Sequence, residues 1–216
     1  MRYFKQYWAF WIPYILNVLI FLSLILCNEK ADLHLWMTSF NSPSGDVFFH
    51  YYTFIGDWIP YAAVGLLLFY KFRTALFVLV SQAVTGLISI IIKQTWNELR
   101  PVLYFNQHFP SVRLHLVAGE HMNLYHSFPS GHTITAFAFF LALAFYTTKP
   151  TLHFVYFVLA LLVGLSRIYL SQHFAIDVLI GSLIGVFGTI LCKYYFDKLP
   201  MKWADGSLLK SLRLLF

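Results

Sequence analysis

The sequence has little charge. Only 11% of its 216 residues are charged, against 59% hydrophobic and 20% aromatic residues, and its mean hydropathy is +0.67. Soluble chains carry about 25% charged residues, so this composition excludes a soluble globular domain. The low charge and the many bulky apolar side chains also exclude a disordered chain, a collagen and a coiled coil. The composition therefore predicts an integral membrane protein.

Cysteine is scarce as well. Cys27 and Cys192 are too few for a disulfide framework, and no Cys-x-x-Cys pair or Cys/His cluster indicates a zinc or redox site. The first apolar segment is longer than the core of a signal peptide and is followed by no small-residue cleavage site. We therefore expect it to be retained as a membrane span.

The apolar residues fall into segments of membrane-spanning length. A bilayer core about 30 Å thick needs roughly 20 apolar helical residues, and six segments qualify: residues 7–27, 47–70, 74–92, 130–148, 152–170 and 174–195. The second is the least regular, because His50, Gly56 and Asp57 interrupt its first half, so that residues 47–57 could instead lie at the interface. The predicted fold is all-α, a six-span bundle forming a single domain over residues 1–216 with a long loop at 93–129.

The basic residues predict an orientation. The net charge of +6 could suggest nucleic acid, but in a membrane chain the loops that hold Lys and Arg matter more, and no nucleic-acid partner is expected. With a cytoplasmic N-terminus, ten basic residues lie inside: Arg2, Lys5, Lys71, Arg73, Lys149, Lys193, Lys198, Lys202, Lys210 and Arg213. Five lie outside: Lys30, Lys93, Arg100, Arg113 and Arg167. Both termini are therefore expected inside and the 93–129 loop outside.

Two features near the C-terminus have structural interpretations. Residues 205–216 place leucines on one face and Lys210 and Arg213 on the other, which predicts an interfacial helix, with a frayed tail as the alternative. Gly181, Gly185 and Gly188 form a stripe of small residues in the last span, which predicts close helix packing rather than chemistry.

Three basic residues lie beside span ends on the outer side, where Lys and Arg are disfavoured. These are Lys93, Arg100 and Arg167. Any one of them could reach toward lipid headgroups. The three together, near several histidines, favour a site for an anion.

The segment Pro129-Ser130-Gly131-His132 opens the fourth span. Ser130 is a favourable helix N-cap, and Gly131 allows the backbone to approach a ligand closely. Backbone amides and the positive end of the helix dipole would then face an anion, which indicates a phosphate cradle. An ordinary cap followed by a loop histidine is the alternative.

His173 and Asp177 are four residues apart, a spacing that places two side chains on one helix face. A carboxylate bonded to one ring nitrogen fixes the tautomer and makes the other nitrogen a better nucleophile. Beside Arg167 and on the same side as His132, the pair is interpreted as catalytic.

These residues form a three-part pattern: Lys93-x6-Arg100-Pro101, then Pro129-Ser130-Gly131-His132, then Ser166-Arg167-x5-His173-x3-Asp177. The pattern resembles the signature of the type 2 phosphatidic acid phosphatase (PAP2) superfamily, whose membrane members are lipid phosphate phosphatases. Order and spacing match throughout, and the six-span layout covers most of the chain.

The resemblance implies a role for each matching residue. His173 would be the nucleophile that forms a phosphohistidine, Asp177 would orient it, and His132 would be the general acid and base. The phosphate would be bound by the remaining members of the pattern: Lys93, Arg100, Ser130, Gly131 and Arg167. The resemblance implies no cofactor and no metal, and no carboxylate cluster in the sequence suits Mg²⁺.

The family also suggests the substrate and the setting. The layout resembles bacterial members, so we expect a cytoplasmic membrane with the site facing outward, and undecaprenyl diphosphate as the leading substrate. Phosphatidic acid, phosphatidylglycerol phosphate, lipid A and a sugar phosphate are alternatives, as is a membrane protein that binds or transports lipid without catalysis. The oligomeric state is left open. Several loop residues could contact a headgroup or lie at the surface: His108, Arg113, His115, Glu120, His121 and His126, with His50 and Asp57 beyond the loop.

Overall fold

The computed structural model describes residues 5–209, and this part of the chain is helical, without a strand. Four of its helices are long and apolar enough to cross a membrane: α2 (Trp8–Cys27), α6 (Phe72–Thr95), α9 (Pro150–Tyr169) and α10 (Ala175–Phe196). On α2, apolar side chains such as Leu16 and Leu19 are more than half exposed, as expected for a surface that faces lipid. The all-α membrane fold is confirmed.

The second predicted span is broken. It consists of α4 (Pro43–Tyr52), the 3-10 turn η1 (Thr53–Gly56) and α5 (Ile59–Tyr70), and the two halves are bent by 54°. Asp57 has a non-helical backbone, and Pro60 lies in the first turn of α5, where its missing N–H is harmless. The break falls at the polar positions that interrupt this segment, and counting the bent pair as one span gives five spanning segments.

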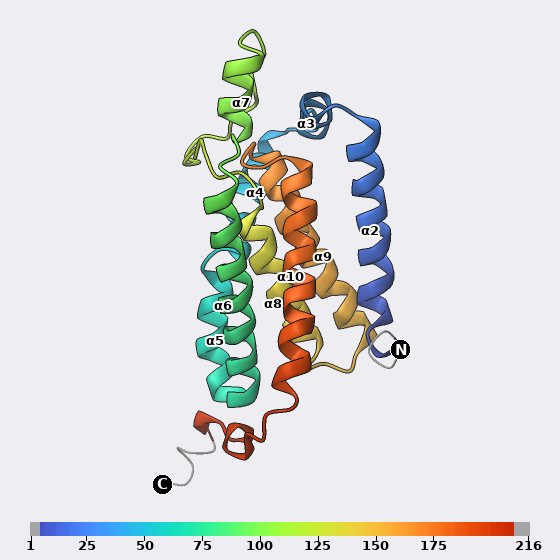
Figure 1. Ribbon diagram of the computed structural model, residues 1–216, viewed down its shortest axis with the longest axis vertical. Coiled ribbons are helices and arrows are strands. Elements are labelled where there is room, and N and C mark those ends of the chain that lie inside the picture. The colour runs from blue at the N-terminus through green and yellow to red at the C-terminus, as the bar shows by residue number, and fades with distance from the viewer. Residues whose placement is uncertain (1–4, 210–216) are drawn as a thin grey trace.

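The fourth predicted span is shorter than expected. It corresponds to α8 (Gly131–Ala144), whose 14 residues extend about 21 Å, less than the bilayer core. Most of its side chains are buried, because α8 lies in the middle of the bundle and packs against α6, α9 and α10 (Figure 1). Since protein surrounds α8, its ends need not reach the membrane surface.

The glycine stripe of α10 brings this helix against α8 and α6. A Cβ atom added at Gly181 would lie 2.8 Å from the carbonyl oxygen of Ser130, and one at Gly185 only 2.6 Å from that of Ile134. Gly188 makes the same kind of approach to Thr85 of α6, with a Cβ distance of 2.5 Å to Cγ2. The predicted close packing is confirmed, and it fixes the start of α8 beside the start of α10.

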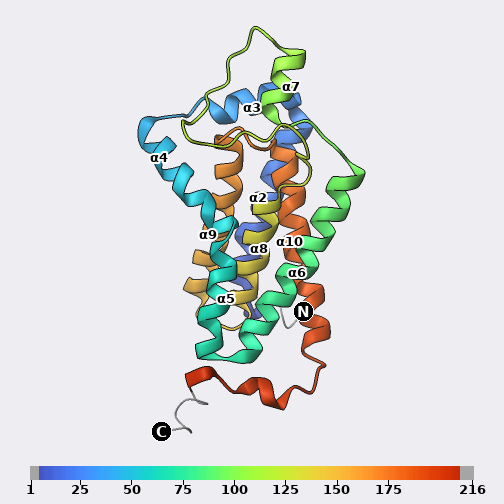
Figure 2. The same ribbon diagram turned by 90° about the vertical axis from the view of Figure 1, so that its left-hand side faces the viewer.

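Short helices occupy the connections at the two ends of the bundle (Figures 1 and 2). One end carries α3 (Lys30–Thr38) and α7 (Pro101–His108), in segments that the sequence predicts as loops. The other end carries η2 (Lys202–Asp205), which is joined to the α5–α6 turn by the Lys71–Asp205 ion pair of 2.9 Å. The predicted interfacial helix over 205–216 lies mostly outside the described residues, which end at 209.

Candidate functional site

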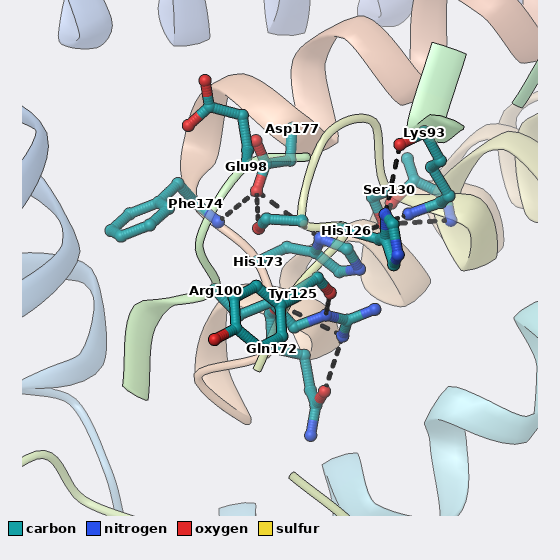
Figure 3. A network of polar contacts seen from close by, with 12 residues as sticks. Lys93, Glu98, Arg100, Tyr125, His126, Ser130, Gln172, His173, Phe174 and Asp177 are labelled. Carbon is teal, nitrogen blue, oxygen red and sulfur yellow. Dashed lines mark hydrogen bonds and ion pairs between the residues drawn. The ribbon is translucent and has the colours of Figure 1, made fainter. Parts of the chain in front are cut away.

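Asp177 lies in the first turn of α10, and its carboxylate is held in place by several groups. Oδ2 accepts hydrogen bonds from Ser127 Oγ at 2.6 Å and from the backbone N–H of Phe174 at 2.9 Å (Figure 3). The same oxygen lies 3.5 Å from Nδ1 of His173, and both side chains are buried. The predicted His–Asp pair therefore exists.

The reason for the pairing differs from the one expected. His173 does not lie on a helix; it belongs to the tight turn between α9 and α10, and α10 begins two residues later. The backbone N–H groups of Gln172 and His173 both donate to the carbonyl oxygen of Arg167, at 3.0 and 3.1 Å. This turn aims the imidazole back at the helix start, where Asp177 is located.

His173 is an uncharged imidazole near neutral pH. Burial lowers its pKa well below the ordinary value, and the positive charges of Arg100, Arg167 and Lys93 lower the pKa further. A proton on Nδ1, which faces Asp177, leaves the lone pair on Nε2. The ring therefore presents a neutral nitrogen with a free electron pair to a strongly positive environment.

Arg100 is bound to the same turn. Its Nη1 donates to the side-chain Oε1 of Gln172 at 2.8 Å and to the carbonyl oxygen of Gln172 at 3.3 Å. Its Nε donates to the carbonyl oxygen of Tyr125 at 3.0 Å. The guanidinium is thus fixed next to His173 by the residue that precedes it (Figure 3).

The other two cations approach from different helices. Lys93, near the end of α6, donates from Nζ to the carbonyl oxygen of His126 at 2.6 Å. Arg167, near the end of α9, donates from Nη1 to Thr53 Oγ1 at 2.6 Å, while its buried Nε has no hydrogen-bond partner within residues 5–209. The charges of Lys93, Arg100 and Arg167 act on His132 as well as on His173, so the predicted cations and histidines converge.

The start of α8 is built as the cap prediction requires. Ser130 Oγ accepts from the hydroxyl of Thr133 at 2.8 Å and from its N–H at 3.5 Å, and Ser130 N–H donates to the carbonyl oxygen of Asp177 at 3.0 Å. A Cβ added at Gly131 would meet only Ser89 Oγ, at 4.0 Å. Open space therefore lies beside this backbone, and His132, which follows, is partly exposed.

Three residues of this arrangement are absent from the sequence prediction. Ser127 binds Asp177, Gln172 binds Arg100, and Thr53 binds Arg167. Gln172 directly precedes His173, and Ser127 is two residues before Pro129; this nearness to the motifs is the only signal that the sequence offers. Thr53 is 114 residues from its partner, so no local pattern predicts it.

The long loop is attached to α4 by two histidine–carboxylate pairs. His115 Nε2 lies 2.9 Å from Oδ1 of Asp46, and His50 Nδ1 lies 2.8 Å from Oε1 of Glu120. The charge of Glu120 acts on Arg167, which places this loop residue close to the cations. His108, in contrast, is exposed and bonds to a carbonyl one turn earlier in α7.

The chain is similar in sequence to several known proteins. The family model described as the PAP2 superfamily matches residues 74–201, which is more than half of the chain. Phosphatidylglycerophosphatase B of Bacillus subtilis (strain 168) is 34% identical over 82 residues, covering 34% of this chain and 40% of that relative. The bacitracin transport permease protein BcrC of Bacillus licheniformis is 30% identical over 149 residues, covering 68% of this chain and 70% of that relative.

Two solved structures have the same fold. LpxE of Aquifex aeolicus matches with a TM-score of 0.67 at 24% identity, over 77% of this chain and 95% of that one. The transmembrane PAP2-type phosphatidylglycerolphosphate phosphatase of Bacillus subtilis matches with a TM-score of 0.62 at 23% identity, over 88% and 98% of the two chains. The helical arrangement is therefore shared with both of these proteins.

Proposed function

The chain belongs to the PAP2 superfamily, and from this premise we propose that it hydrolyses the phosphate ester or diphosphate of a membrane lipid. The observation that carries the proposal is the buried His173–Asp177 pair beside three cations from separate segments. A protein that only bound a lipid phosphate would need the cations. It would not need an uncharged imidazole oriented by a buried carboxylate.

In the first step, Nε2 of His173 attacks phosphorus, a P–N bond forms and the bond to the lipid oxygen breaks. The negative charge of the bound phosphoryl group offsets the three cations, so that His132 takes up a proton in the complex and gives it to that leaving oxygen. Asp177 stabilises the positive charge that develops on the His173 ring. In the second step His132 takes a proton from water, the water oxygen attacks phosphorus, and the P–N bond breaks to release inorganic phosphate.

The binding groups suit the transition state of this reaction. Phosphoryl transfer spreads negative charge over three equatorial oxygens, and catalysis depends on positioning and on charge stabilisation. Lys93, Arg100 and Arg167 supply positive charge, and the start of α8 supplies backbone N–H groups. The open space beside Gly131 and the unpartnered Nε of Arg167 support a phosphoryl group bound between them. We propose that the reaction needs no metal.

The headgroup is a separate proposal. Undecaprenyl diphosphate is the leading substrate from the sequence, whereas two matched relatives are named for phosphatidylglycerophosphate, which supports that lipid as its main competitor. Phosphatidic acid and lipid A stay as further candidates from the family resemblance. The name of BcrC supports a transport function as the second candidate.

We further propose that the site faces the outside of the membrane, as the distribution of Lys and Arg predicts. A cysteine placed at Asn97, in the exposed connection between α6 and α7, tests this orientation in intact cells or spheroplasts. Labelling by a membrane-impermeant maleimide is expected in a background without Cys27 and Cys192. Labelling only after the membrane is opened would reverse the orientation.

Phosphate release by the detergent-purified protein tests the reaction. The panel contains undecaprenyl diphosphate, phosphatidylglycerol phosphate, phosphatidic acid and lipid A, with His173→Ala as the inactive variant. His108→Ala is the matched control, because this histidine is exposed and its hydrogen bond within residues 5–209 is to the carbonyl oxygen of Tyr104 in the same helix. Turnover of one lipid, lost in His173→Ala and kept in His108→Ala, supports the proposal. Equal phosphate release by the His173→Ala variant would refute it.

A further inference from the structure

Helix α3 lies outside the segment that the family model matches, yet it packs against the turn that carries His173. Three residues of α3, at positions i, i+3 and i+4, make this contact from one face. Nζ of Lys30 is 4.1 Å from the ring centroid of Phe174, and Leu33 packs in a buried cluster with Ala175. The third is His34, which is 1% exposed.

His34 contacts residues that precede and follow His173 in the sequence. A hydrogen bond of 3.3 Å joins its Nε2 to Ser171 Oγ, and its ring centroid is 5.2 Å from that of Phe174 in an edge-on arrangement. The ring also packs against Phe105, with centroids 5.7 Å apart. The imidazole is thus enclosed by aromatic rings and has its one hydrogen bond within residues 5–209 to the turn.

The turn needs such support. Ser171 has a φ of +51°, in the left-handed region that residues other than glycine adopt rarely and at a cost. Phe174, three residues later, donates its N–H to Asp177. His34 therefore holds the strained residue at one end of the turn and the ring of Phe174 at the other, with His173 between them.

The His34 ring is uncharged in the pH range in which the enzyme would work. Burial lowers the pKa of His34 to about 4, an effect opposed by the charge of Asp177 and reinforced by that of Lys30. A neutral imidazole among aromatic rings carries no desolvated charge. Its role near neutral pH is therefore to hydrogen-bond and to pack, without transferring a proton.

We propose that His34 is a positioning residue of the phosphatase site, which sets the approach of His173 to phosphorus by holding Ser171 and Phe174. The inference rests on the proposed function. It assigns to α3, a helix beyond the matched family segment, the task of keeping the nucleophile in register with Asp177. Binding of the phosphoryl group depends on cations from other segments, so the loss of His34 should act on kcat rather than on KM.

Substitutions that separate packing from hydrogen bonding test the proposal. His34→Phe keeps an aromatic ring and removes Nε2, while His34→Gln restores a polar nitrogen at similar reach. A hydrogen bond of this kind corresponds to a roughly three- to tenfold loss of kcat in His34→Phe, with KM changed less than twofold. His34→Gln is expected to recover kcat to within about twofold of the original protein. Trp36→Phe, at an exposed position of α3, is the control and should match the original protein.

Ser171→Ala examines the same bond from the other side. Serine and alanine both carry a Cβ, so the left-handed backbone is equally strained in both, and only the hydroxyl is lost. The variant should show the same loss of kcat, and the double variant His34→Phe/Ser171→Ala should lose no more than either single one. Unchanged kcat in Ser171→Ala, or losses that multiply in the double variant, would overturn the proposal. If His34→Phe does not fold, Ser171→Ala decides alone.

A measurement without turnover keeps the inference apart from the proposed function. Hydrogen exchange of the peptide covering residues 170–176, followed by mass spectrometry in detergent, should be at least threefold faster in His34→Phe. Unchanged exchange there would refute the positioning role. If the unmodified protein hydrolyses no lipid of the panel, the proposed function fails, while the exchange result still decides whether His34 holds the turn.

Discussion

Ser127 offers a sharp test of how Asp177 is held. Its hydroxyl lies 2.6 Å from Oδ2 of Asp177, and the serine is fully buried in the described structure. Hydrogen bonds to a charged group contribute about 1.5–3 kcal/mol. Ser127→Ala removes the bond and leaves the carboxylate with the Phe174 N–H and His173.

If the whole of this energy acts in the transition state, kcat/KM falls roughly 10- to 150-fold. The reason is that Asp177 must stay aligned with the His173 ring while positive charge develops there. The assay is phosphate release against whichever lipid the panel identifies, at substrate concentrations that define kcat and KM separately.

Ser182→Ala is the matched control. This serine is also buried and also lies on α10, but its hydroxyl donates to the carbonyl of Leu179 at 2.7 Å and not to Asp177. Its kcat/KM should stay within about twofold, because such a local bond adds only about 1 kcal/mol to stability. A Ser127→Ala variant as active as this control would refute the claim that the hydroxyl aligns the carboxylate.

Further predictions concern packing, metal and pH. Gly185→Ala should lower the unfolding free energy by about 1–3 kcal/mol, because its Cβ would lie 2.6 Å from the carbonyl oxygen of Ile134. Thermal unfolding measures this loss. Gly86→Ala is the control and should show no such loss, because a Cβ at position 86 meets nothing within 4 Å. EDTA should leave phosphate release unchanged, since the three cations supply the charge; a loss restored only by Mg²⁺ would contradict this. His34 should contribute roughly 3 kcal/mol to the fall in unfolding free energy as the pH drops from 6.5 toward 4, because the unfolded chain protonates this histidine near 6.5 and the folded chain only near its pKa of about 4. Thermal unfolding at several pH values should show that the stability of His34→Phe depends less steeply on pH than that of the original protein. An equal pH dependence would exclude His34 as a source of the effect.

Hydropathy and motif spacing predict the long elements and the residues that converge. The apolar runs of α2, α6, α9 and α10 agree closely with the predicted spans, because a bilayer requires apolar residues throughout its thickness. The same reasoning overextends α8, since residues 145 and 146 are still aromatic while the helix has already ended. Hydropathy measures which residues tolerate an apolar environment, and it does not detect where a buried helix stops.

The supporting contacts were beyond prediction because they join distant segments. Thr53 and Arg167, or Asp46 and His115, have no common motif and meet only when the bundle is assembled. The short helix α3 carries too little periodicity to indicate a helix, and nothing in its sequence distinguishes His34 from a surface histidine. Sequence motifs identify the residues that have a chemical role more readily than the residues that keep them in position.

The hydrogen bond from Ser130 to Asp177 has a consequence for how the protein is made. A nascent chain that has been synthesised as far as α9 already contains Lys93, Arg100 and Arg167, but it lacks Gln172, which binds Arg100, and the carbonyl that receives the Ser130 N–H. These partners arrive only with the turn after α9 and with α10. Under the proposed function, activity is therefore acquired only at the end of translation and membrane insertion, because an unfinished chain that ends with α9 lacks His173 and Asp177.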